Sequence, residues 1–164
     1  PLVALGAQVT LARKGTSRTV LLEELLVKPY RTDIAPEELI TRISFPKPNP
    51  EAGFAFIKLG RRKALAISRM NVAAYVETDA SGLVRDVRIV PGSCMPTAVR
   101  MTPAEEMLLG KTPSYALHEA IGRKVAEEMV AVTGRRWSTP YKEPVIASLV
   151  KRALNEATGV KEDA

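Results

Sequence analysis

Six short stretches in the first 90 residues have the composition and alternation of β-strands. Residues 13–17 and 79–82 carry turn residues, so each segment is predicted to link two neighbouring strands. The last strand has one more apolar side, with Leu83, Val87 and Ile89 beside Arg85, and an opposite side with Val84, Asp86, Arg88 and Val90. We therefore expect a sheet that water wets on one face. The six predicted strands are residues 7–12, 18–21, 39–45, 54–59, 71–77 and 83–90.

After Pro91 the apolar spacing becomes that of α-helices. Thr102–Glu105 has the sequence of a capping box with proline at the first helical position, and Gly110 is expected to end that helix. A second helix is predicted from about Ser114 to Gly134, with Leu117, Ile121, Val125, Met129 and Val132 on one apolar stripe. A third carries Ile146, Leu149, Val150, Ala153, Leu154 and Ala157 and closes at Gly159.

The order of strands followed by helices predicts an α+β fold. In it, three helices pack on one face of an antiparallel sheet of three to four strands, and a strand-rich segment precedes that sheet. Pro46, Pro48 and Pro50 continue neither a strand nor a helix easily, so they are the best candidate for a boundary. We expect residues 1–50 and 51–164 to form two units.

Composition limits the class of protein. In 164 residues, 46% are hydrophobic and 26% charged, which suits a folded domain with a real core. Cys94 is the single cysteine, so no internal disulfide forms and a reducing, cytoplasmic location is expected. No apolar run approaches the roughly 20 residues that span a bilayer. A chain that opens on Pro1 is expected to be cut from something longer.

Few residues offer catalysis or metal binding. One histidine and one cysteine supply no set of three or four metal ligands. A nucleophilic pair of Cys94 and His118 is formally possible, but a lone cysteine is usually a small buried hydrophobe, and a lone helical histidine usually lies at the surface or caps a helix. We predict no catalytic residue in this chain.

Residues 58–63, Lys-Leu-Gly-Arg-Arg-Lys, form the one dense basic cluster in a chain of net charge +6. It is open to three interpretations: a solvated loop, a nucleic-acid contact or an anion site for a cofactor. Aromatic residues are only 5% and just Phe54 and Phe56 lie close, which disfavours a base-stacking platform. Lys58 lies within a predicted strand, so the backbone would fix its direction. The scattered glycines form no phosphate-binding loop.

Four ordered segments are similar to one known family. Residues 53–73 resemble the "F-x-K-x-x-x-R…A-I-x-x-V-x-V-A" signature of flavoprotein subunits in the xanthine dehydrogenase and carbon monoxide dehydrogenase family, the molybdenum hydroxylases. Pro96–Arg100, Ala104-Glu105 and Leu108–Gly110 look like a second family segment. Tyr141-Lys142 with Leu149–Leu154 resembles the closing helix. Residues 1–45, which include Tyr30-Arg31, resemble the tail of the preceding FAD-binding domain.

The resemblance implies a role in electron transfer by FAD. In this family, the first half of the subunit holds most of the FAD, and the second half adds a wall beside the flavin ring. The residues that match this wall are Ile40 and Lys58. A lysine ammonium beside the N1–C2=O edge of the flavin would favour its reduced, anionic form. The resemblance also identifies residues 1–50 as the tail of the FAD-binding domain and residues 51–164 as the C-terminal α+β domain.

The implied partners are the N-terminal half of the same subunit, a molybdenum-binding subunit and an iron–sulfur subunit. The molybdenum cofactor and the 2Fe-2S clusters would lie in those subunits, so the isolated chain is expected to be inactive. Lys142 in place of the usual Arg, Pro144 and residues 134–137 depart from the family pattern and concern the subunit interface. Two alternatives stay open: a basic nucleic-acid-binding module, which is disfavoured, and a purely structural assembly module.

Overall fold

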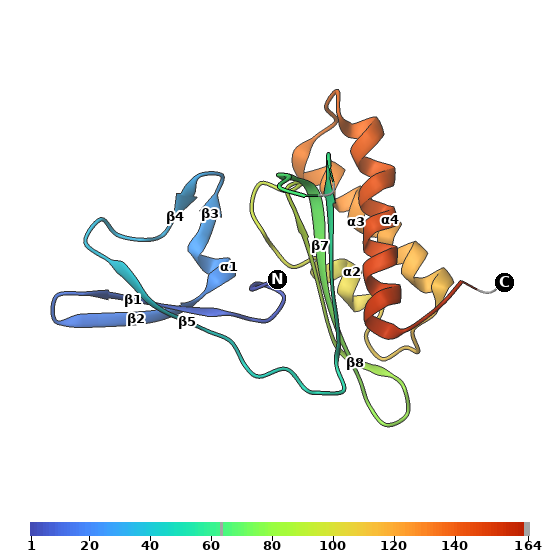
Figure 1. The fold of residues 1–164 in the computed structure, drawn as a ribbon, viewed down its shortest axis with the longest axis horizontal. Helices are drawn as coiled ribbons and strands as arrows, with labels where there is room; N and C mark the ends of the chain where they lie inside the picture. Colours follow the sequence, from blue (N-terminus) through green and yellow to red (C-terminus); the bar gives the residue numbers. More distant parts are fainter. Residues whose placement is uncertain (63, 163–164) are drawn as a thin grey trace.

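The computed structural model of the protein describes residues 1–62 and 64–162. Figure 1 shows two lobes, a mostly stranded N-terminal lobe and a C-terminal domain in which helices cover a sheet. All six predicted strands form, at nearly the predicted residues. The elements of the N-terminal lobe are β1 (Gln8–Arg13), β2 (Thr16–Leu21), α1 (Leu22–Leu25), β3 (Leu26–Lys28), β4 (Arg31–Thr32) and β5 (Leu39–Ser44).

The N-terminal lobe is built on an antiparallel sheet with the strand order β2-β1-β5. Gly15 has a φ of +80°, which closes the predicted turn between β1 and β2. The core of this lobe is small, a cluster of three buried residues: Val9, Leu11 and Leu25. The edge strand β5 is exposed along its whole length.

The C-terminal domain contains the antiparallel sheet β6-β7-β8, and its three helices lie on one face of this sheet (Figure 1). This arrangement confirms the predicted α+β fold. Gly53 allows the closest approach, since an added Cβ would lie 1.6 Å from the carbonyl oxygen of Ala157 in α4. The elements are β6 (Gly53–Gly60), β7 (Ser68–Thr78), β8 (Val84–Gly92), α2 (Thr102–Glu106), α3 (Tyr115–Thr133) and α4 (Thr139–Thr158).

One hydrophobic core joins the helix-facing side of this sheet to all three helices. The predicted stripe of α3 contributes Ile121, Val125 and Met129, and Leu117 packs against it half-buried. Leu149 and Leu154 of α4 join the same core, as predicted. Val132, near the end of α3, was expected on the stripe, but it is 57% exposed. The helix α4 begins at Thr139 and continues through Pro144.

The opposite face of the sheet is not simply wetted, contrary to the prediction. Val3 and Ala4 pack on Ala73 and Val90 of that face, and Arg88 donates a hydrogen bond to the carbonyl oxygen of Ala4 at 3.2 Å. The N-terminal segment therefore covers the middle of β7 and β8.

The predicted sides of β8 were wrong at Val84, which was expected on the side opposite to Val87 and Ile89. A β-bulge shifts the pairing of β7 and β8 between Glu77 and Thr78. As a result Val84 joins the helix-side core together with Val87 and Ile89.

The predicted capping box was wrong as well. The helix α2 has Met101 as its N-cap residue and no capping hydrogen bond from a side chain. Glu105 is buried instead, where it accepts a hydrogen bond from the backbone N–H of Ile89 at 2.8 Å and pairs with Arg100 at 2.7 Å. The carboxylate therefore ties α2 to β8 rather than closing its own helix.

The segment between the two lobes is held to the sheet by a carboxylate. Glu77 of β7 is buried and accepts hydrogen bonds from Asn49, Arg85 and the Tyr75 hydroxyl. These hydrogen bonds lower the pKa of Glu77, and the bond from Asn49 has the largest effect.

None of the helices in the described part of the chain combines the length and hydropathy that a bilayer span requires.

Candidate functional site

The outer face of β6 is the part of the sheet that neither helices nor the N-terminal segment covers. Alternation along the strand sends Ala55, Ile57 and Leu59 toward the helices, where they join the core. Phe54, Phe56 and Lys58 therefore share the other face. Phe54 is 40% exposed and Phe56 is 43% exposed. The strand presents two aromatic rings and one ammonium group in a row.

Lys58 has a fixed place in this row. It pairs across the strands with Asn71 of β7, and Asn71 pairs in turn with Gly92 of β8. Gly92 makes room for the Asn71 side chain, because an added Cβ would lie 2.4 Å from its Oδ1 atom. The Asn71 amide donates to the Ser68 hydroxyl at 3.1 Å. Among residues 1–62 and 64–162, Lys58 forms no ion pair, so its charge is available to a ligand.

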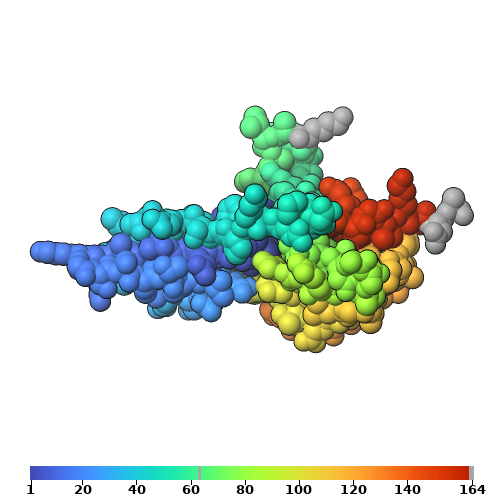
Figure 2. Space-filling view, turned by 90° about the horizontal axis from the view of Figure 1, so that it is seen from below, coloured from blue at the N-terminus to red at the C-terminus, as the bar shows by residue number. Residues whose placement is uncertain are grey.

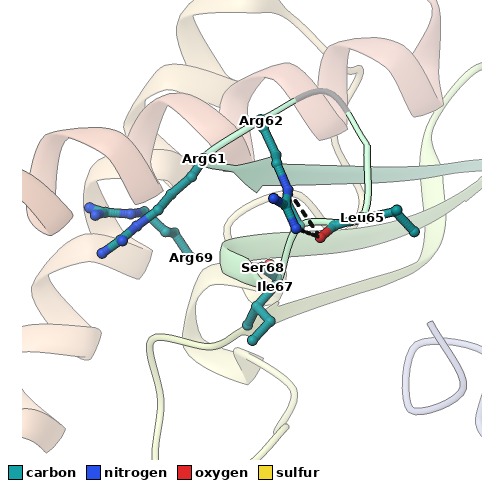
Figure 3. A pocket seen from close by; sticks show the side chains of 7 residues that line it. Arg61, Arg62, Leu65, Ile67, Ser68 and Arg69 are labelled. Atoms are coloured by element: carbon teal, nitrogen blue, oxygen red, sulfur yellow. Dashed lines mark hydrogen bonds between the residues drawn. The ribbon is translucent and has the colours of Figure 1, made fainter.

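The β6–β7 loop stands out from the body of the molecule, as the green projection in Figure 2 shows. Arg62 folds back and donates to the carbonyl oxygen of Leu65 at 2.7 Å and 3.3 Å (Figure 3). Leu65 has a φ of +51°, an uncommon conformation for a branched residue that these bonds help to hold. Arg61 and Arg69 lie together, away from Arg62. The loop encloses a pocket of about 530 Å³ lined by residues 61–62 and 65–69.

The predicted basic cluster is thus divided among separate places. Lys58 lies on the sheet face, Arg62 serves its own loop, and Arg61 lies on the other side of that loop. Lys63, the last member of the predicted cluster, lies outside the described residues.

Ile40, the other predicted site residue, lies in β5 of the N-terminal lobe. It pairs with Leu11 of β1, so its side chain is on the same side of the sheet as the buried Leu11, but at the sheet edge. Ile40 is 50% exposed. Leu39, Ile43 and Phe45 are exposed beside it in sequence. The structure thus places Ile40 and Lys58 on different sheets, each next to uncovered apolar surface.

Cys94 and His118 do not form a catalytic pair. Cys94 is buried in the loop after β8, and burial raises the pKa of its thiol to about 11, so it behaves as the predicted small hydrophobe. His118 was expected near the surface, but it is buried between α3 and α4, where its Nδ1 lies 2.6 Å from the Asn155 side-chain oxygen. Burial lowers the pKa of His118, although the bond to Asn155 opposes this shift. We infer that Nδ1 carries the proton and that the ring is neutral.

This arrangement offers groups that can bind a ligand, namely two exposed aromatic rings and one ammonium. No three His, Cys, Asp or Glu side chains gather in the described part of the chain in a way that would hold a metal ion. Two exposed aromatic rings beside an ammonium can contact a planar ligand whose edge carries carbonyl oxygens or negative charge. Phe54, Phe56 and Lys58 could contact the ring of a flavin, but they form no cradle for its phosphates.

Sequence reasoning did not identify Asn71, which lies beside Lys58. No signal marked this residue, because its position follows from the register of β6 and β7 rather than from its neighbours in sequence. The exposed face of Phe54 and Phe56 could have been found, since both alternate with Lys58 along one predicted strand.

Two models of protein families match the chain. Residues 55–157 match the CO dehydrogenase flavoprotein C-terminal domain. Residues 1–48 match the FAD binding domain in molybdopterin dehydrogenase. The first match alone covers more than half of the chain.

Curated relatives agree with these matches. The nicotine 6-hydroxylase medium subunit of Paenarthrobacter nicotinovorans is 29% identical over 95% of this chain and 54% of the relative. The 6-hydroxypseudooxynicotine dehydrogenase complex subunit alpha of the same organism is 31% identical over 95% of this chain and 52% of the relative. The chain thus spans about half the length of these relatives.

A solved structure shares the fold. It is carbon monoxide dehydrogenase from Hydrogenophaga pseudoflava, in a form that lacks the Mo-pyranopterin moiety of the molybdenum cofactor. The TM-score is 0.85 at 26% identity, and the match covers 96% of this chain and 54% of that chain. The nucleic-acid alternative gains no support from any of these comparisons.

Proposed function

The chain belongs to the family of CO dehydrogenase flavoprotein C-terminal domains, and on this premise we propose that it is the C-terminal part of the FAD-binding subunit of a molybdenum hydroxylase. In this proposal residues 1–50 are the tail of the FAD-binding domain, and residues 51–164 are the C-terminal α+β domain. The prolines at 46, 48 and 50 support this division, as does the gap between the matches that end at residue 48 and begin at residue 55.

The observation that carries the proposal is the ammonium of Lys58, which has no ion-pair partner in the described part of the chain and stands at the end of an exposed aromatic strip. A surface of this kind, with Phe54 and Phe56 open to solvent, is expected to contact another molecule or another piece of protein. The flavin, when bound, would accept electrons and pass them to an acceptor. Two residues of this chain would act on the flavin ring. Lys58 would place a positive charge beside it, and Ile40 would make an apolar contact that keeps water away from it.

The parts that this chain lacks define its partners. A flavin also needs a site for its pyrophosphate, and we assign this site to the N-terminal half of the subunit. We assign the molybdenum cofactor and the 2Fe-2S clusters to a molybdenum-binding subunit and an iron–sulfur subunit. The apolar edge strand β5 supports the first assignment, because its exposed Leu39, Ile40 and Ile43 need a cover. Cytoplasm remains the proposed location, since a single buried thiol needs no oxidising compartment.

Flavin retention tests this function. The chain alone is expected to lose FAD during gel filtration, because it has no phosphate-binding loop. Supplying a polypeptide that contains the N-terminal half is expected to restore a flavin that co-elutes with both parts. Ile40→Asp should weaken that retention, since it places a carboxylate against the ring, whereas Val27→Asp, at another exposed apolar position of the same lobe, should not.

A stoichiometric flavin on the isolated chain would contradict the division of the site. A reconstituted pair that never holds flavin would contradict the function itself. If the pair holds flavin, but Ile40→Asp does not weaken its retention and Lys58→Met does not change its reduction potential, the chain is a structural assembly module instead.

A further inference from the structure

A second surface lies on the helix side of the β6–β7 loop. There the loop faces the start of α4 across a hollow of about 370 Å³. Arg61 lines it from the loop and Arg69 from the start of β7. Trp137 lines it from the α3–α4 connection, and Tyr141 and Lys142 line it from α4. These five residues form what we name the cationic–aromatic trough. Lys142 also lines an adjoining hollow of about 430 Å³ beside Cys94 and Arg136, so the trough continues toward the end of β8.

The charge of the trough has one sign. Arg61, Arg69 and Lys142 form no ion pair in the described part of the chain. The nearby Glu143 of α4 is bound to Arg135 at 3.3 Å, outside the trough. Three cations thus surround one hollow and repel one another, a cost that an acidic occupant would relieve.

The aromatic residues of the trough lack a cover. Trp137 is 95% exposed and Tyr141 is 47% exposed. The guanidinium of Arg69 lies 5.9 Å from the centre of the Tyr141 ring, which holds the arginine against the helix. Tryptophan, tyrosine and arginine are the residues that most often dominate the energy of protein–protein contacts. Trp137 lies open to water at the rim of a charged hollow and has no partner among residues 1–62 and 64–162.

We propose that the cationic–aromatic trough docks an acidic polypeptide segment of a partner subunit, with Trp137 as its apolar anchor. This inference rests on the proposed function only in assuming that the chain works within a multi-subunit assembly. The three cations of the trough complement an acidic segment in charge. An arginine fork binds carboxylates through two hydrogen bonds, and two of the three cations are arginines.

Two other occupants fit the observations less well. A membrane surface favours apolar side chains that protrude from a convex surface, whereas Tyr141 and the cations line a hollow. A nucleic acid favours several aromatic platforms along a basic groove, whereas the whole chain has one tryptophan and 5% aromatic residues.

The test uses the chain in its assembly with the molybdenum-binding and iron–sulfur subunits. Because Trp137 is the only tryptophan, a chain labelled with 5-fluorotryptophan gives one ¹⁹F resonance that reports on the trough alone. We expect this resonance to shift when unlabelled subunits are added. The double variant Arg61→Glu/Arg69→Glu and the single variant Trp137→Ala should each weaken assembly by about tenfold or more. Raising the salt concentration should weaken the wild-type assembly more than that of the charge variant.

The matched control is Lys111→Glu, an exposed charge reversal that lies outside the trough, and it should leave assembly unchanged. An assembled complex in which the ¹⁹F resonance does not move overturns the inference and leaves the proposed function intact. Failure of the wild-type chain to assemble counts against the proposed function as well. A resonance that responds to phosphatidylserine vesicles or to duplex DNA, and not to the subunits, assigns the trough to that partner and overturns the proposal.

Discussion

The two sheets of this chain differ in how completely the chain itself covers them. The sheet β6-β7-β8 has one face sealed by α2, α3 and α4, and the N-terminal segment covers part of the other. The sheet β2-β1-β5 shares a core of only three buried residues with α1 and leaves β5 open along its length. One region is thus close to a finished domain, and the other resembles part of a larger structure.

The two sheets differ in coverage because the two regions supply different helices. The C-terminal domain has two long helices, of 19 and 20 residues, whose apolar stripes are wide enough to cover a sheet. The N-terminal lobe has one helix of 4 residues, which covers little. A sheet without such a cover buries too little apolar surface to be stable alone. We therefore expect the surfaces that bind partners to lie where the chain fails to cover its own strands.

Removing core volume from the two regions tests this comparison most strongly. Leu154→Ala in α4 is expected to cost about 2–5 kcal/mol of unfolding free energy, because Leu154 is fully buried in the large core. Leu11→Ala, equally buried but in the small core, is expected at or below the lower end of that range. Denaturant unfolding of both variants measures the two losses.

Equal losses would show that the small core packs around Leu11 as tightly as the large core packs around Leu154. A loss under about half a kcal/mol for Leu154→Ala would show that the helix stripe is not the core at all. In either case the contrast between a well-covered C-terminal sheet and a poorly covered N-terminal sheet would be wrong.

Removing the buried carboxylate of Glu105 tests how α2 is anchored in the C-terminal domain. Glu105→Ala would leave the Ile89 N–H and the Arg100 guanidinium without their shared acceptor, and we expect a loss of about 2–3 kcal/mol. The control is Arg123→Ala, which removes an exposed ion pair with Glu119 on the surface of α3 and should cost less than about 0.5 kcal/mol. A loss for Glu105→Ala as small as that of the control would mean that α2 is not anchored through this residue.

Much of this fold could be predicted from local patterns in the sequence. Alternation predicted the strands, and Gly15, Gly134 and Gly159 lie at the predicted turns and helix ends with positive φ. The stripe through Ile121, Val125 and Met129 predicted the buried side of α3 because helical spacing alone decides which residues share a face. Such features depend on residues close in sequence.

What could not be predicted depends on residues that are distant in sequence. Glu105 followed the capping-box pattern, but a backbone N–H of β8 and the charge of Arg100 bound its carboxylate more strongly. Val84 changed faces because of a bulge that the pairing with β7 creates. At the candidate site, family resemblance indicated Lys58 and Ile40, while Asn71 and the trough around Trp137 emerged only from tertiary packing.

The buried His118 makes the stability of the C-terminal domain depend on pH. Burial lowers the folded-state pKa of His118 below its ordinary value of 6.5. Below that pH the unfolded chain takes up a proton that the folded chain refuses, so the free energy of unfolding falls as the pH falls below about 6.5. The slope from one such group is at most about 1.4 kcal/mol per pH unit. Unfolding between about pH 5 and pH 8 measures it.

The matched control for this slope is His118→Gln. Glu38, Glu77 and Asp79 have lowered pKa values, so their contributions are lost only when the pH falls below their ordinary range near 4. Glu128 has a raised pKa because of burial, so it stabilises the fold at low pH and opposes the slope in both variants alike. An identical slope in the wild type and in His118→Gln would show that His118 does not titrate as inferred.

The smallest expected effect on the fold concerns the surface that the chain leaves open. Lys58→Met should leave the unfolding free energy within about 0.5 kcal/mol of the wild type, because Lys58 is exposed and makes no ion pair among the described residues. In the flavin-loaded assembly, however, we expect the same change to lower the reduction potential of the flavin. Two unit charges 4 Å apart interact by about 1 kcal/mol in water and about 4 kcal/mol at an effective dielectric of 20.

For a two-electron couple this range corresponds to roughly 20–90 mV. A potentiometric titration measures the shift, with Lys58→Arg expected to retain the wild-type potential because it keeps the charge, and Lys14→Met, in the β1–β2 turn, as a control that removes an exposed lysine elsewhere. Lys58→Arg is the decisive comparison, because it keeps the charge and changes the shape of the side chain. If Lys58→Met leaves the potential unchanged while the flavin stays bound, Lys58 is a solvated surface residue and the open face of β6 serves another contact. If Lys58→Arg lowers the potential as much as Lys58→Met does, the lysine acts through a specific hydrogen bond that guanidinium cannot replace, and the electrostatic account of this face is wrong.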